Sequence, residues 1–215
     1  MEQKLTLIQN ALNWRYATKK YDPTKTLSKE EWSAIETALL QAPSSYGLQP
    51  WKALLIESKD LRAQLREISW NQPQVTDASH YVVLLARDAV SETDIDTYMQ
   101  RIAEVRGVDL DSLQGFKDML VKNVVQGLEP NARHTWAQRQ AYIGMGFALE
   151  TAALVGVDAT PMEGLDARAY DKLLKLENTG WKTVAAIAFG HRHAEDAYQT
   201  LKKVRKEASS LIERR

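Results

Sequence analysis

The chain has 215 residues and is 44% hydrophobic, which gives it enough length and apolar content to build a substantial core. Its 28 Lys and Arg residues balance 28 Asp and Glu residues, so nothing in the net charge favours nucleic acid or an anionic membrane as a partner. Because the sequence contains no cysteine, it excludes disulfides, thiolate catalysis and thiolate-bound metal centres.

The sequence also carries no signal for export or for insertion into a membrane. The first residues lack the apolar segment of a secretory signal peptide, and no stretch approaches the roughly 20 consecutive apolar residues of a membrane helix. We therefore expect a cytoplasmic protein. No internal repeat, low-complexity stretch or linker divides the chain, so we expect a single domain over residues 1–215.

The N-terminal region predicts two helices separated by a basic segment. Apolar residues from Leu5 to Trp14 recur at helical spacing. Residues 15–23 follow as an extended segment with three cations in six residues, which are either a solvated surface or a clamp for a phosphate. Ser28 and Glu31 have the spacing of a capping box, which predicts a helix that continues to Gln41.

A loop of small and polar residues follows this second helix. Pro43 and Pro50 fix φ and withhold backbone donors, so neither flanking element runs through residues 42–51. Ser44 and Ser45 leave accessible amides and hydroxyls between them. This loop is either a plain helix-to-strand connector or, held by rigid flanks, a place for ligand contacts.

Three apolar runs predict strands, at residues 51–57, 81–86 and 183–189. A short helix is expected over residues 58–68, and residues 158–166 are expected to form a loop. Few strands among many helices argue for an α+β domain rather than a regular βαβ series.

The remaining helical segments differ in polarity. Residues 91–127 have a polar helical texture typical of a peripheral excursion or a lid. Residues 135–156 are apolar nearly all round, so this helix should lie in the centre of the fold or in an oligomer interface. Residues 167–176 predict a further short helix.

Familiar catalytic motifs are missing. The sequence has no Walker loop, Gly-x-Ser-x-Gly elbow, His-Glu-x-x-His pair or full dinucleotide fingerprint, and no carboxylate pair stands out. His191 and His193 lie on one side of an extended segment without a further ligand cluster, so we expect no metal site. Scattered basic residues and small polar loops remain, and these suit a protein that holds a phosphorylated cofactor.

Five segments together resemble the FMN-dependent nitroreductase family, also called NAD(P)H:flavin oxidoreductases. They are Arg15-Tyr-Ala-Thr-Lys19-Lys-Tyr21, Pro43-Ser-Ser-x-x-x-Gln-Pro-Trp51, Asn71 before Asp77-Ala-Ser-His80, Pro161-Met-Glu163-Gly164 and Lys203-Val-Arg205. The similarity runs from about Leu5 to Arg205 and is closest to the oxygen-insensitive enteric nitroreductase and flavin reductase branch. It implies a nitroreductase-like α+β fold, with a mixed, mainly antiparallel sheet wrapped by helices. It also implies an intertwined homodimer with exchanged C-terminal tails and FMN at the interface.

The resemblance assigns the charged residues to the cofactor. Arg15, Lys203 and Arg205 are expected to bind the FMN phosphate, because guanidinium and ammonium groups suit a doubly charged anion. Lys19 is expected near the N1 and C2 carbonyl edge of the flavin, where a cation tunes its potential. No side chain is expected to be catalytic in its own right, since FMN carries the chemistry.

The resemblance also implies contacts from uncharged and loop residues, although each of them alone is equally consistent with an ordinary surface or turn residue. The further expected FMN contacts are the backbone of Tyr16 and Ala17, Pro43, Ser44 and Ser45 from the other subunit, Asn71 at the pyrimidine edge, Gln74 near the flavin, Gln140 near the ribityl chain, and Glu163 and Gly164 beside the isoalloxazine. The open flavin face is expected to be shaped by Tyr46, Asn71 and residues 110–127.

The sequence departs from the common family pattern at three positions. Ala17 stands where a hydroxyl residue is frequent, which removes one hydrogen bond to the phosphate. Gly47 stands where Asn is frequent. Gln74 stands where close relatives have Lys, and the loss of that cation should make bound flavin harder to reduce.

The activity implied is a two-electron ping-pong reduction. NADH or NADPH is the donor, and a nitroaromatic, quinone or free flavin is the acceptor. Alternatives are a dihydropteridine or enal reductase or a dehalogenase-like member of the same family, a flavin-storage or redox-sensing protein without turnover, and a cofactor-free helical interaction domain.

Overall fold

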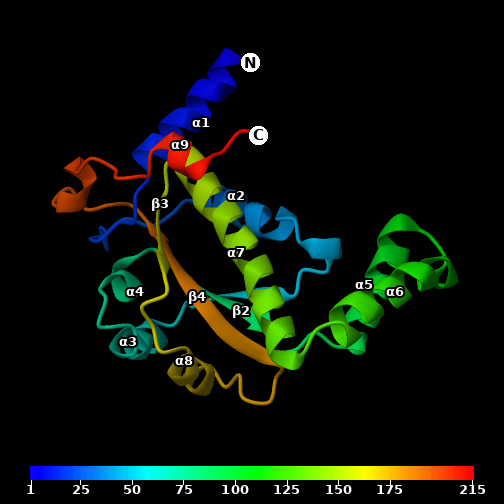
Figure 1. Ribbon diagram of the computed structural model, residues 1–215. Coiled ribbons are helices and arrows are strands. Elements are labelled where there is room, and N and C mark those ends of the chain that lie inside the picture. Colours follow the sequence, from blue (N-terminus) through cyan, green and yellow to red (C-terminus); the bar gives the residue numbers. More distant parts are fainter.

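A four-stranded antiparallel sheet forms the centre of the protein in the computed structural model, which describes residues 1–215 (Figure 1). The strand order is β1-β2-β4-β3, and all three pairings are antiparallel. The strands are β1 (Trp51–Leu55), β2 (His80–Arg87), β3 (Asp158–Met162) and β4 (Trp181–Gly190). A sheet of this kind among many helices confirms the α+β prediction.

Strand β3 corrects the expectation of a loop over residues 158–166. It pairs with β4 from Asp158 opposite Gly190 to Met162 opposite Ala186. Because β3 is an edge strand, Pro161 is tolerated there without the loss of an interior ladder hydrogen bond. The loop begins only after Met162 and leads to Asp166, which caps the next helix through its side chain, as expected.

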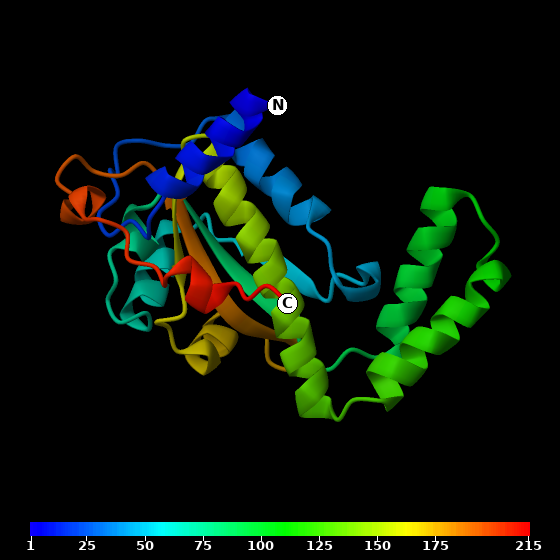
Figure 2. The ribbon, with the colours of Figure 1, turned by 45° about the horizontal axis from the view of Figure 1, so that its top comes forward.

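One face of the sheet is covered by two helices, and a third helix packs on one of them. Helix α7 (Pro130–Leu154) crosses it beside α2 (Lys29–Gln41), and α1 (Glu2–Trp14) lies against α7 (Figures 1 and 2). The core on this side joins residues of β2 and β4 to α2 and α7, among them Val82, Ile187, Ile35, Met145 and Ala148. Alternate residues of β2 point to this face and to the opposite one, as the strand period requires.

The opposite face is covered by shorter helices. These are α3 (Lys59–Glu67), α4 (Gln74–Asp77) and α8 (Ala167–Leu173) (Figure 1). Their core contains Tyr81, Val83 and Leu85 of β2 together with Leu65 and Tyr170. Both faces of β2 are therefore buried, which explains its continuous apolar sequence.

The helical excursion over residues 91–127 projects from the body as an arm (Figure 2). It consists of α5 (Glu92–Arg106), a 3₁₀ turn (Leu110–Leu113), α6 (Gln114–Leu120) and a π-helical turn (Val121–Gln126). The arm has a small core of its own. It meets the loop after α2 through Tyr98, whose hydroxyl donates to the carbonyl of Tyr46 at 2.9 Å.

The C-terminal segment returns to the beginning of the chain. After a 3₁₀ turn (Ala197–Thr200) it runs past the end of α1 to a last short helix, α9 (Ala208–Leu211) (Figures 1 and 2). The Lys203 ammonium donates to the carbonyl of Leu12 in the same chain. No helix of the protein is both long enough and apolar enough to cross a membrane. Exchange of the tail between subunits stays a prediction.

Candidate functional site

A cleft of about 390 Å³ lies where the segment after α1 meets the C-terminal tail. Both of its walls carry residues expected to bind a cofactor. The segment after α1 contributes Arg15, Tyr16, Ala17 and Lys19, and the tail contributes Lys203 and Arg205. The structure thus brings together residues that are almost the whole chain apart in sequence.

The cations of this cleft lie close enough to affect each other's protonation. Burial and the nearby Arg205 lower the pKa of Arg15, and burial together with Arg15 and Arg205 lowers the pKa of Lys203. Two of the cations donate to carbonyl oxygens, Lys203 to that of Leu12 and Arg205 to that of Val204 at 2.7 Å. The buried Nε of Arg15 has no partner. Such a cluster suits a ligand with more than one negative charge.

The segment that carries Arg15 and Lys19 is fixed by contacts to β3. Ala17 forms a parallel bridge with Ala159. Thr18 links this segment to β3 by two hydrogen bonds. Its hydroxyl donates to Asp158 Oδ1 at 3.2 Å, and its carbonyl accepts from Thr160 Oγ1 at 2.7 Å. The chain after α1 therefore runs alongside β3, whose far end leads directly to Glu163 and Gly164.

A second group of expected residues lies at that far end of β3. Gln72 Nε2 donates to the carbonyl of Gly164 at 2.9 Å, which ties the loop after β3 to the loop before α4. A Cβ at Gly164 would lie 2.7 Å from the ring of Trp70, so only glycine fits against this indole. Glu163 accepts a hydrogen bond from the phenol of Tyr142, and burial followed by this bond raises the pKa of that phenol to about 12.

The polar side chains of the loop before α4 are oriented by the protein. Arg66 Nε donates to Asn71 Oδ1 at 3.0 Å, so the Asn71 amide nitrogen is turned away from this contact and can donate to a ligand. Gln74 is only 4% exposed, and its Oε1 has no hydrogen-bond partner in the protein. A buried acceptor without a partner is costly, so this oxygen points to a donor that the chain does not supply.

A third group lies elsewhere in the chain. Pro43, Ser44 and Ser45 follow α2, and the Ser45 amide donates to Oε1 of Gln140 at 2.9 Å. Neither these residues nor Gln140 lines the cation cleft of the same chain. Tyr46, with a φ of 59°, faces the arm, where Asn123 Nδ2 donates to its hydroxyl at 3.4 Å.

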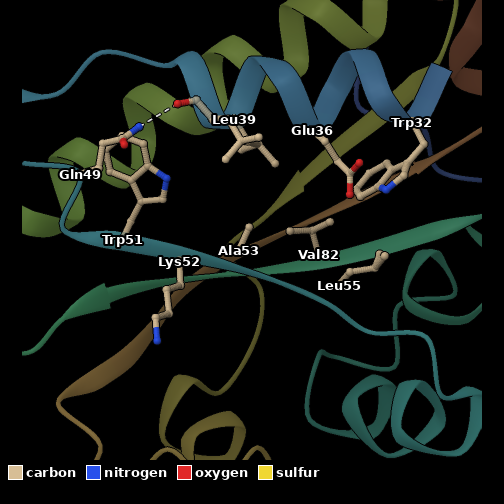
Figure 3. Close-up of a pocket in the computed structure, with 10 residues that line it drawn as sticks. Trp32, Glu36, Leu39, Gln49, Trp51, Lys52, Ala53, Leu55 and Val82 are labelled. Atoms are coloured by element: carbon tan, nitrogen blue, oxygen red, sulfur yellow. Dashed lines mark hydrogen bonds between the residues drawn. The ribbon is translucent and has the colours of Figure 1, made fainter. Parts of the chain in front are cut away.

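A larger cavity, of about 510 Å³, lies between α2 and the edge strand β1 (Figure 3). Its walls include Trp32, Leu39, Trp51 and Leu55, and Lys52 points away from it (Figure 3). It contains none of the residues expected to bind a cofactor and no cluster of cations. The cavity therefore does not compete with the cation cleft as a site for a phosphorylated ligand.

Four further residues contact these groups and were not predicted from the sequence to belong to the site. They are Trp70, Gln72, Tyr142 and Asp196. Trp70 is 81% exposed and, like Asn71, has a left-handed φ, and neither property has a local sequence signal.

The histidines expected to bind no metal lie near single carboxylates, His191 at 4.0 Å from Glu31 and His193 at 3.7 Å from Glu195. No group of three or more His, Asp or Glu side chains is placed to hold a metal ion.

Comparison with known proteins gives a consistent result. A model described as "Nitroreductase family" matches residues 12–191. The Bacillus subtilis protein named "Putative NAD(P)H nitroreductase YfkO" is 35% identical over 198 residues, which cover 87% of this chain and 89% of that protein. A nitroreductase-like protein from Streptococcus mutans has a TM-score of 0.82 at 19% identity, covering 99% of this chain and 98% of that one. A "putative nitroreductase in complex with FMN" from Exiguobacterium sibiricum has a TM-score of 0.79 at 20% identity, covering 97% of each chain.

Proposed function

This chain belongs to the nitroreductase family of oxidoreductases, and we propose that it uses FMN to transfer electrons from NADH or NADPH to a small electron-poor acceptor. Nitroaromatics, quinones and free flavins are the acceptor classes that we propose. The reasoning rests on how well the residues of the cleft and of the loops beside β3 fit a flavin mononucleotide.

The observation that carries the proposal is the convergence of Arg15, Lys203 and Arg205 on one cleft. Lys203 and Arg205 donate to carbonyl oxygens rather than to carboxylates, and the buried Nε of Arg15 lacks a partner. A phosphate monoester would supply both the charge and the acceptor oxygens that this cluster lacks. We therefore assign the FMN phosphate to these three side chains and to the backbone of Tyr16 and Ala17.

The groups at the far end of β3 suit the ring of the same cofactor. The Asn71 amide nitrogen offers a donor for a pyrimidine carbonyl, and the unpartnered Gln74 Oε1 offers an acceptor for a ring N–H. Gly164, whose carbonyl is held by Gln72, belongs to the same group, and we assign its backbone to the edge of the ring. The Lys19 ammonium lies 5.7 Å from the centroid of the Tyr198 ring. In the proposed complex it would place a positive charge near the flavin ring.

When bound, FMN supplies the redox chemistry by accepting a hydride from NAD(P)H and passing two electrons to the acceptor. The protein's own contribution is to hold and orient this cofactor. None of the proposed contact residues is arranged as a nucleophile with an attendant base, so we assign no catalytic side chain.

A second copy of the chain is part of the proposal. Within one chain, Pro43, Ser44 and Ser45 lie apart from the cation cleft. Helices α1 and α7 expose apolar side chains, among them Leu12 and Phe147. Burying such a surface against its copy would remove it from water and would bring the loop of one subunit to the cleft of the other. Tyr46, Asn71 and residues 110–127 would then shape the open face that admits donor and acceptor.

The absorption spectrum of the purified full-length protein, followed by anaerobic titration with NADH and with NADPH, tests the proposal. We expect a yellow protein whose flavin absorbance is bleached by at least one nicotinamide and restored by menadione or nitrofurazone. Bound flavin that supports no acceptor-dependent oxidation of NADH or NADPH would favour storage or sensing instead. A colourless protein that takes up no FMN would contradict the proposal and would favour an interaction domain.

A further inference from the structure

A single buried carboxylate joins the two segments that line the cation cleft. Asp196 is 2% exposed. Its Oδ2 accepts hydrogen bonds from the Tyr16 hydroxyl at 3.0 Å, from the Lys19 amide at 2.8 Å and from the Lys20 amide at 3.1 Å. Its Oδ1 accepts from the Tyr198 amide at 3.0 Å. All four donors lie on the two segments that form the walls of the cleft.

The protonation state of Asp196 is set by these four donors. Burial alone would favour the neutral acid, but the hydrogen bonds from the Lys20, Lys19 and Tyr198 amides and from Tyr16 lower the pKa of Asp196 below its ordinary value. The side chain is therefore ionised at neutral pH, and each of its bonds has the strength of a charge-assisted contact.

Asp196 does not act as a counterion for the cations of the cleft. Lys203 and Arg205 donate to carbonyl oxygens, Arg15 forms no bond to Asp196, and three of the four donors to Asp196 are backbone amides. What the carboxylate fixes is the path of the chain. It holds residues 16–20 against residues 196–198, at the start of the tail that carries Lys203 and Arg205.

We propose that Asp196 is a positioning residue that assembles the phosphate end of the cofactor site by joining the two walls of the cleft. This inference rests on the proposed function, because it takes the ligand of the cleft to be the phosphate of FMN. The alternative is a purely structural link that stabilises the fold without affecting which ligand is bound. The two differ in one measurable respect, since only the first changes the preference for a phosphorylated flavin.

Riboflavin provides the probe that separates these readings, because it has the ring and ribityl chain of FMN without the phosphate. The ratio of the riboflavin dissociation constant to that of FMN therefore reports the phosphate end alone. We expect the full-length Asp196→Asn protein, freed of bound flavin, to bind FMN roughly tenfold more weakly, as expected when one charge-assisted contact is lost. Its affinity for riboflavin should change by less than about twofold, within the error of independent sites.

Two further variants sharpen the test. Glu195→Gln changes the neighbouring exposed carboxylate, which pairs with Lys20 at the surface, and should leave both affinities unchanged. In an Arg205→Ala background, Asp196→Asn should produce little additional loss of FMN, because a residue that acts by placing Arg205 has less to place once Arg205 is gone. Full additivity of the two losses would contradict action through the tail cations.

An Asp196→Asn protein that folds and keeps the wild-type ratio would overturn the inference. If this variant does not fold, Asp196→Glu takes its place, because the longer side chain keeps the charge but moves the carboxylate away from its four donors, and an unchanged ratio there would overturn the inference equally. Failure of the proposed function would look different, because the wild-type protein itself would then show no preference for FMN over riboflavin.

Discussion

At the scale of single residues, the free protein gathers like charges in one cleft, among them Arg15, Lys203 and Arg205. Burial and neighbouring cations lower the pKa of both Arg15 and Lys203. This repulsion opposes the folded arrangement until an anion neutralises it. Ligand binding to the native state should therefore stabilise the protein as well as complete the site.

Adjacent residues of the tail provide a matched pair of substitutions. Arg205 lines the cleft, whereas Lys206 does not. We expect Arg205→Ala to weaken FMN binding by roughly 10- to 100-fold, as expected for the loss of a charged hydrogen-bond donor to a phosphate. Lys206→Ala, which removes the same charge one residue later, should retain FMN nearly as the wild type does. Equal retention in both variants, measured by flavin fluorescence during dialysis, would remove the phosphate assignment for the tail.

The charge of these residues suits a phosphate ligand and is visible in the sequence alone. Hydrophobic periodicity, however, does not predict that they meet in one cleft. Arg15, Lys203 and Arg205 were assigned to one phosphate only through the resemblance to a family, and the structure brings them to one cleft. Asp196 was missed because an isolated aspartate near a chain end has no pattern that reveals its partners. Its bond to the Tyr16 hydroxyl spans 180 residues, so only the fold shows it.

At the scale of elements, the start of α2 shows how local sequence determines structure. The Ser28 hydroxyl accepts from the Glu31 amide at 3.1 Å, and the Glu31 carboxylate accepts from the Ser28 amide at 2.7 Å. This is the capping box expected from the sequence. Because α2 carries Ile35 and Leu39 into the core, the cap also fixes one wall of the fold.

Removal of this cap should have a defined cost and pH dependence. Ser28→Ala should lower the free energy of unfolding by about 1 kcal/mol, measured in urea. The hydrogen bond from the Ser28 amide lowers the pKa of Glu31 below its ordinary value of 4.5. The ionised Glu31 carboxylate therefore contributes its full stabilisation above about pH 4.5. This contribution is lost as the pH falls through the lower pKa that Glu31 has in the folded protein. Glu31→Gln should flatten this part of the pH profile, whereas the exposed control Glu30→Gln should keep it; a wild-type profile in Glu31→Gln would contradict the assignment.

The one strand that the sequence analysis missed shows where element prediction fails. Residues of β1, β2 and β4 are apolar runs, and all three strands were expected. Strand β3 begins with Asp158 and contains Pro161, two residue types that are depleted in strands. Its position at the sheet edge and its pairing with β4 outweigh this local preference, and neither is visible in a window of a few residues.

At the scale of the whole molecule, helices α1 and α7, which pack against each other, both carry exposed apolar side chains. Leu5 and Leu12 of α1 and Ile143 and Phe147 of α7 are each at least 39% exposed. The apolar sequence of residues 135–156 predicts a helix either in the centre of the fold or in an oligomer interface. The structure buries one side of α7 on the sheet and leaves the other side open, which is the arrangement that a dimer interface needs.

A charge placed on this open side should separate the proposed dimer. We expect Phe147→Glu to raise the dimer dissociation constant by at least about 100-fold, because an unpaired carboxylate would be buried in the interface. Light scattering coupled to size-exclusion chromatography measures the change. Lys172→Glu, on exposed α8 at the opposite face of the sheet, serves as the control and should remain dimeric. A monomeric wild type, or an unaffected Phe147→Glu protein, would contradict the dimer.

The cleft between the segment after α1 and the C-terminal tail has a consequence for biosynthesis. Every strand of the sheet has been translated once Gly190 emerges from the ribosome, so the hydrophobic core can begin to form while the nascent chain is still growing. The proposed phosphate site, however, includes Lys203 and Arg205, which are translated after the last strand. If the assignment of Lys203 and Arg205 to the phosphate holds, a transcript with a premature stop just after Gly190 yields a chain with its β-sheet sequence intact and without two of the three side chains proposed to bind the phosphate.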